Sequence, residues 1–213
     1  MLTLEQVRNK SAARLMGLYP IVGQAAIKLI ERCYARGVPI VITQGLRTIS
    51  EQNELYAKGR TAPGPKVTNA KGGYSNHNFG MAIDFALLQS DGRSVSWTMN
   101  KDWMTVVEEA KALGFSWGGD WRDFKDYPHL EMTFGLTTAE LRAGKKPPQA
   151  SMDAVLSKIK KGEVTMNKVD ANDIIDKFLK PAYGAAKTDK ERTEIGRLAD
   201  SLRVASGQPK QNG

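Results

Sequence analysis

Residues 75–86 read Ser-Asn-His-Asn-Phe-Gly-Met-Ala-Ile-Asp-Phe-Ala, and this stretch decides the fold. Its second half, Gly80–Ala86, is an apolar run that contains a single carboxylate, Asp84, and it predicts a strand. Side chains alternate along a strand, so the small residues and the acid should share one face. The other face should carry the large apolar side chains Ile83, Phe85 and Leu87. A carboxylate in such a strand needs a hydrogen-bond partner or a metal ion.

Outward from this strand, helices and short strands follow one another without regular βαβ alternation, which favours the α+β class. We expect a small mixed or antiparallel sheet with flanking helices, and a small helical region at the C-terminus. The expected segments are a helix opened by Thr3–Gln6, a helix from Pro20 to Gly37, a strand at 39–43, a helix at 48–58, a long loop at 59–73, a helix at 102–113 and a strand at 129–133.

The stretch Gly144–Ser151 combines proline, glycine and charge, as linkers do. It predicts three parts: a first domain at residues 1–143, a linker at 144–151 and a helical accessory region at 152–213. Two amphipathic patterns in the last part, around residues 173–179 and 194–204, predict helices there.

The formal net charge of the 213-residue chain is +8, which indicates an anionic partner. The basic residues are spread along the chain without interleaved aromatics, so we expect no nucleic-acid binding. No apolar run reaches the ~20 residues that span a bilayer. Residues 1–6 have neither a basic start nor an apolar run, and we expect no export signal. The one cysteine, Cys33, lies in an apolar helical pattern and should belong to the core.

The chain contains two histidines, His77 and His129. Together with Asp84 they would make a three-ligand set for a catalytic zinc ion, with a fourth position left for water. Two other readings remain open from the residues alone. The histidines could be ordinary surface or core residues, and Asp84 could pair with an arginine such as Arg47.

Three motifs make the pattern specific. Residues 75–84 have the form SxHxxGxAxD, and residues 126–129 read Asp-Tyr-Pro-His. The third motif is Gly45-Leu-Arg-Thr48, followed by Glu51-Gln-Asn-Glu-Leu-Tyr56 and Gly59-Arg60. With these motifs the chain resembles the VanY / D-alanyl-D-alanine carboxypeptidase superfamily of zinc peptidases over roughly residues 1–135. Within it, the likeness is closest to phage endolysins that are L-alanyl-D-glutamate endopeptidases.

The resemblance implies His77, Asp84 and His129 as ligands of Zn²⁺. It implies Asp126 as the general base that takes a proton from the zinc-bound water. Arg47 would hold a substrate carbonyl or carboxylate, and Ser75 would bond to substrate near the metal. Carboxypeptidase relatives usually carry Glu-Pro-Trp-His at the second motif, whereas this chain has Asp-Tyr-Pro-His followed by Leu130. This departure leaves the shape of the pocket open, and Trp117, Trp121 and Tyr127 either line it or only pack.

The function implied is hydrolysis of the L-alanyl-D-glutamate bond in peptidoglycan. Two alternatives are a D-alanyl-D-alanine carboxypeptidase or dipeptidase, and a wall-binding module with an inactive zinc site. We expect a monomer that is made in the host cytoplasm and acts on the wall after release. The region after Ser151 should bind the wall, including its anionic polymers, through its basic helices. The alternative for this region is a helical extension that packs on the first domain.

Overall fold

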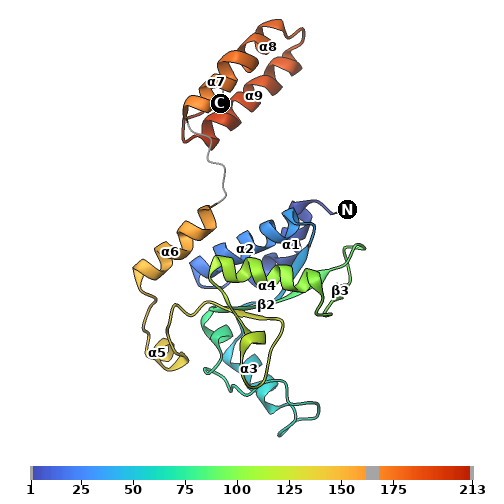
Figure 1. The fold of residues 1–213 in the computed structure, drawn as a ribbon, viewed down its shortest axis with the longest axis vertical. Coiled ribbons are helices and arrows are strands. Elements are labelled where there is room, and N and C mark those ends of the chain that lie inside the picture. The colour runs from blue at the N-terminus through green and yellow to red at the C-terminus, as the bar shows by residue number, and fades with distance from the viewer. Residues whose placement is uncertain (1, 162–167, 212–213) are drawn as a thin grey trace. The chain divides into compact units, whose positions relative to one another are not determined.

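The structure is a computed structural model that describes residues 2–161 and 168–211. The described residues form two compact units, Met1–Lys161 and Gly162–Gly213, and each is described by itself (Figure 1). No helix in the described part of the chain is both long enough and apolar enough to span a bilayer.

The first unit is built on a five-stranded antiparallel sheet, which confirms the α+β class. Its strands are β1 (Ile40–Gln44), β2 (Ala82–Leu88), β3 (Val95–Ser96), β4 (Ser116–Trp117) and β5 (His129–Glu131). The order is β1-β2-β5-β4, and β3 pairs with β2. β2 is therefore the central strand, and the pairing sets Asp84 directly opposite His129.

Helices cover the apolar side of this sheet. They are α1 (Leu4–Leu15), α2 (Pro20–Ala35) and α4 (Lys101–Leu113), and α6 (Gln149–Lys160) packs on α2 and α4. The shorter helices α3 (Ile49–Ala57) and α5 (Thr138–Arg142) lie nearer the loops. As the alternation predicted, Ile83 and Phe85 are fully buried in the core, and the Phe85 ring stacks on Trp103. Cys33 is buried in the same core, and burial raises the pKa of its thiol to about 12, so it is no nucleophile.

The starts of these helices could be predicted from the sequence because a capping box involves only residues that are close together in the chain. Thr3 and Thr48 each form the predicted capping box, with Gln6 and Glu51. α4 ends at Gly114, whose φ of 108° favours glycine. The short α5 was missed, although Thr137 and Glu140 form the same capping box at its start.

The boundary between the parts differs from our prediction. The segment 144–151 lies inside the first unit, and α6 begins within it. α6 buries Val155 and Ile159 in the core, and Arg32 donates to the Lys158 and Lys161 carbonyls with N···O distances of 2.7 and 3.0 Å. The division therefore falls after Lys161, because the apolar face of α6 is part of the core of the first unit.

In the C-terminal unit the described residues form α7 (Lys168–Ile174), a π-helical turn (Ile175–Leu179), α8 (Lys180–Ala185) and α9 (Asp189–Ala205). The π-turn precedes Pro181, which lacks the amide hydrogen that a regular helix uses. The two predicted amphipathic segments fall within these helices. The region predicted at 152–213 is basic, with a net charge of +3, but the C-terminal unit itself, residues 162–213, holds nine basic and eight acidic residues, a net charge of +1. The remaining +7 belongs to residues 1–161.

Candidate metal centre and active-site cleft

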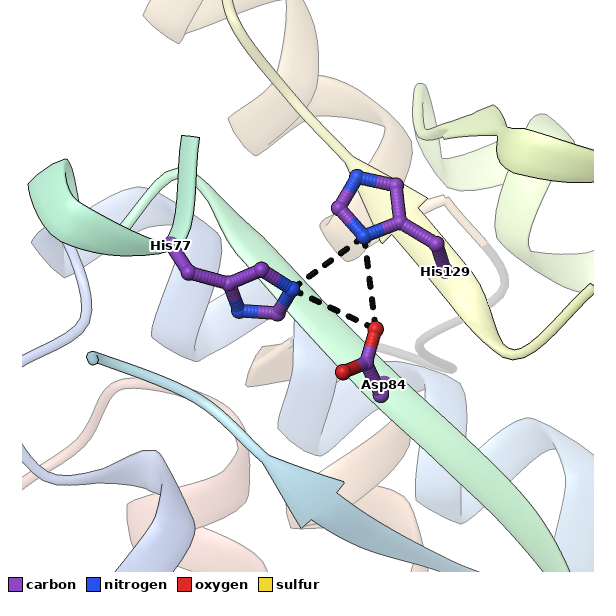
Figure 2. A group of neighbouring side chains, drawn as sticks. All are labelled: His77, Asp84 and His129. Carbon is purple, nitrogen blue, oxygen red and sulfur yellow. Dashed lines mark hydrogen bonds and ion pairs between the residues drawn. The ribbon is translucent and has the colours of Figure 1, made fainter. Parts of the chain in front are cut away.

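Three side chains converge at one point of the sheet (Figure 2). His77 comes from a short 3₁₀ helix (Asn76–Phe79), Asp84 from β2 and His129 from β5. His77 Nε2 lies 3.1 Å from His129 Nδ1, and each nitrogen lies 3.3 Å from Asp84 Oδ1. Both histidines are buried, with 2% and 5% of their surface exposed. The sequence-predicted ligand set is thus one cluster that could hold a metal ion.

The outer nitrogen of each imidazole has its own partner. His77 Nδ1 lies 2.8 Å from the Gly45 carbonyl oxygen, and His129 Nε2 lies 3.0 Å from a carboxylate oxygen of Glu131. Both partners are acceptors, so we assign the imidazole hydrogens to these two nitrogens. The Glu131 carboxylate is held in turn by the Asn76 side-chain amide at 2.8 Å. Glu131 and Asn76 were not predicted, although Glu131 stands one strand period after His129.

This assignment leaves two nitrogen lone pairs and a carboxylate oxygen facing one another, an arrangement that requires a positive charge between them. A proton on His129 can supply this charge, as the pKa values of the cluster indicate. Burial opposes charge on His129, but its bonds to Asp84 and Glu131 outweigh burial and raise the pKa of His129 to about 9. Burial likewise opposes charge on Asp84, and the two histidines nevertheless hold the pKa of that carboxyl well below its usual range.

The geometry fits a tetrahedral metal ion. Ligands at the ~2.0–2.1 Å typical of zinc are about 3.3 Å apart at tetrahedral angles. The three donor atoms here are 3.1 to 3.3 Å apart. Two imidazoles and one carboxylate are also the donors that catalytic zinc sites use. The residues present therefore fit the ion that the motifs imply.

Arg47 follows β1 and reaches the same cluster. Its Nη2 lies 3.5 Å from Asp84 Oδ2, while Asp84 Oδ1 faces the histidines. The ion pair and the metal-ligand reading are therefore compatible. Only 12% of the Arg47 side chain is exposed, and this burial lowers the pKa of the guanidinium in spite of the nearby acids.

Gln52 of α3, which was not predicted, fixes Arg47. The fully buried amide accepts from Arg47 Nη1 at 2.8 Å and donates to the Ala70 carbonyl at 2.7 Å. It therefore connects the arginine to the long loop predicted at 59–73. A glutamine on a short helix looks like a surface residue in sequence, so no local signal could have found it.

Asp126 lies on the turn that leads into β5. Its backbone amide donates to the Gly118 carbonyl, and its own carbonyl accepts from His129, both at 3.2 Å. Gly118 permits this turn, because a Cβ there would stand 2.4 Å from the Asp126 carbonyl oxygen. Burial raises the pKa of the Asp126 carboxyl, and the charge of Asp84 adds to this, whereas His129, His77 and Arg47 oppose it. Asp126 thus belongs to the electrostatic environment of the cluster.

Ser75 has a structural task as well as a place in the cleft. Its hydroxyl accepts from the His77 amide at 3.4 Å and caps the 3₁₀ helix that presents this histidine. The structure is therefore compatible with two roles for Ser75, as a turn residue and as a residue that binds substrate.

A cleft of about 570 Å³ opens over the cluster. One wall is the loop at 67–70 together with Leu55, and the other is the segment from Trp121 to Asp126. Trp121 lines the cleft, the first of the two roles left open for it, and its ring lies 5.0 Å from the His129 ring. Trp117 is buried and does not line it, since its indole nitrogen donates to the Tyr127 carbonyl.

The chain is similar in sequence to known peptidases. Residues 68–132 match the family described as D-alanyl-D-alanine carboxypeptidase. The chain is 54% identical over 123 residues to the peptidoglycan L-alanyl-D-glutamate endopeptidase CwlK of Bacillus subtilis, covering 54% of this chain and 73% of that protein. It is 26% identical over 203 residues to the L-alanyl-D-glutamate peptidase of Listeria phage A118, covering 92% of this chain and 68% of that protein.

Among solved structures, the L-Ala D-Glu endopeptidase ChiX of Serratia marcescens is 26% identical, with a TM-score of 0.43 over 59% of this chain and 87% of that one. The segment that matches the family contains Ser75, His77, Asp84, Asp126 and His129. From the identity with CwlK over most of that protein's length, and from the family match across the site, the chain belongs to the D-alanyl-D-alanine carboxypeptidase family of peptidases, among its L-alanyl-D-glutamate endopeptidases.

Proposed function

We propose that this protein is a zinc peptidase that hydrolyses the L-alanyl-D-glutamate bond of peptidoglycan stem peptides. The observation that carries the proposal is the buried His77–Asp84–His129 triangle at the base of a cleft, in a chain 54% identical to an endopeptidase named for this bond. His77, Asp84 and His129 would hold the zinc. Bound there, the ion would supply Lewis-acid chemistry, by acidifying a water and polarising the scissile carbonyl.

The other roles belong to side chains around the triangle. Asp126 accepts the proton of the attacking water, and partial burial with a raised pKa keeps this carboxylate poorly solvated and hence basic. Arg47, buried and held by Gln52, places a fixed positive charge where the substrate oxygen becomes negative. Ser75, which lines the cleft beside His77, binds the peptide.

The experiment that tests this function is digestion of purified cell walls followed by mass spectrometry of the fragments. We expect new N-terminal glutamate, with L-alanine left on the muramyl side, and no products after treatment with a chelator. Release of free D-alanine instead would identify a carboxypeptidase, in keeping with the name of the family. Retention on walls without any cleavage would identify a binding module with an inactive site.

For the C-terminal unit we propose wall binding. The alignment with the phage A118 peptidase covers 92% of this chain and so reaches into this unit. The unit carries a net charge of only +1, so electrostatic attraction to anionic polymers gives this proposal little support. The exposed apolar side chains of the unit, among them Phe178 and Tyr183, offer contacts that do not depend on charge.

A further inference from the structure

Two cations converge on one aromatic ring at the rim of the cleft. Tyr74 lines the cleft, and 45% of its surface is exposed. The guanidinium carbon of Arg142 lies 3.8 Å from the centre of the Tyr74 ring, and Lys71 Nζ lies 4.7 Å from it. Both distances are within the range of cation–π interactions. Three side chains from two separate segments therefore make one positively charged platform.

Neither cation has an acidic partner among the described residues. Some other basic side chains of the first unit do form ion pairs, as Arg36 does with Glu108 and Glu109. The single side-chain hydrogen bond described for Arg142 goes from Nη1 to the Gly73 carbonyl, at 2.8 Å. Both positive charges lie close to the same ring, so an anion bound beside Tyr74 would be attracted by both of them.

Arg142 is held in a fixed place. It is the last residue of α5, which is capped by Thr137 and Glu140 and anchored by the buried Leu141. Its bond to Gly73 uses one of five N–H donors, so the planar guanidinium keeps donors that match the two oxygens of a carboxylate. The acids that line the cleft form no described ion pair with Arg142 or Lys71; they are Asp84, Asp123, Asp126 and Glu131.

We propose that Lys71 and Arg142, placed over Tyr74, form a subsite for a carboxylate of the peptide that occupies the cleft. This inference rests on the proposed function and deepens it, because it makes the enzyme selective for acidic stem peptides. A glutamyl residue bonded through one carboxyl group keeps the other free, so such a peptide carries the required charge. Arg142 lies outside the segment that matches the family, at residues 68–132.

The test compares two soluble muropeptides of equal length, one with free carboxylates and one with the same groups amidated. For the free acid, Arg142→Ala and Lys71→Ala should each raise KM about tenfold, as expected for loss of one charge-assisted bond, with kcat and zinc content unchanged. For the amidated peptide KM should not change. Lys66→Ala changes an exposed lysine of the neighbouring loop for which no contact with the Tyr74 ring is described, so it is the matched control and should leave both KM values unchanged.

Other outcomes would overturn the subsite. If Arg142→Ala raises KM equally for both peptides and Arg142→Lys does not restore selectivity, Arg142 only positions Gly73. If a soluble phosphodiester wall polymer competes with wild type and not with the variants, the anion recognised is a phosphate. Cleavage of either peptide by wild type establishes the function independently of the subsite. If neither is cut, calorimetric binding of the same two peptides gives the same comparison without turnover.

Discussion

The two units of this chain differ in how their polar side chains are held. In the first unit, bonds between distant residues build the site, such as those from His77 to His129 and from Asn76 to Glu131. Most hydrogen bonds described in the C-terminal unit join neighbours in sequence, such as Arg203 to Asp200 at 2.8 Å, although the Gln211 amide also donates to Asp200, at 2.9 Å. The hydrophobic core cluster lies within the first unit, up to Ile159. A reactive site needs groups that only tertiary structure can bring together, and the first unit is the one that provides them.

The largest effect should follow from breaking the triangle. His77→Ala removes one of three donors and leaves Asp84 and His129 facing each other, so we expect loss of the metal and of all measurable lysis. The loss should exceed the ~10²–10⁴-fold associated with a general base. Metal analysis and wall turbidity are the two measurements. Retention of the variant on walls serves as the control that the C-terminal unit is intact, and an active variant without metal would contradict the site.

The next effect separates chemistry from metal binding. Asp126→Asn keeps the size of the side chain and removes the proton acceptor, so turnover should fall by ~10²–10⁴-fold while metal content and melting temperature stay the same. Asp123→Asn is the matched control, because it makes the same change three residues away in the same cleft. Equal activity of the two variants would exclude Asp126 as the base.

The metal cluster, the residues around it and the boundary between the units show how much the sequence could predict. His77, Asp84 and His129 were found because rare side chains stand at fixed positions beside an apolar strand, and strand pairing then brings Asp84 opposite His129. Gln52 and Arg142 were not found, since each acts through backbone carbonyls far away in the chain. The boundary at Lys161 was missed for the same reason: α6 looks like the start of a new region until Val155 and Ile159 are seen in the core.

A smaller effect on activity, but a clear one on stability, should separate two truncations. A chain that ends at Lys145 loses α6, and two buried aliphatic side chains at about 1.5–3 kcal/mol each give a cost of about 3–6 kcal/mol. That is a large part of the ~5–15 kcal/mol that typically holds a domain together. A chain that ends at Lys161 keeps α6 and should melt within ~2 °C of the same unit in the full chain. Calorimetry of both truncations measures this, and equal melting temperatures would show that α6 does not stabilise the first unit.

The smallest effect concerns salt, and it divides the two units by charge. The first unit carries +7 and the C-terminal unit +1, so attraction of the first unit to an anionic wall should weaken as salt shortens the reach of its charge. The extra retention contributed by the C-terminal unit should change less than about fivefold, because one exposed charge is worth less than about 1 kcal/mol.

The measurement is wall retention of full-length Asp126→Asn and of the same variant ending at Lys161, at low and at high salt. The truncated chain should be released at high salt while the full chain stays bound. Walls stripped of anionic polymers are the control, on which the truncated chain should bind weakly even at low salt. Should the full chain be released together with the truncated one, the C-terminal unit would add no charge-independent contact, and its proposed role in wall binding would fail.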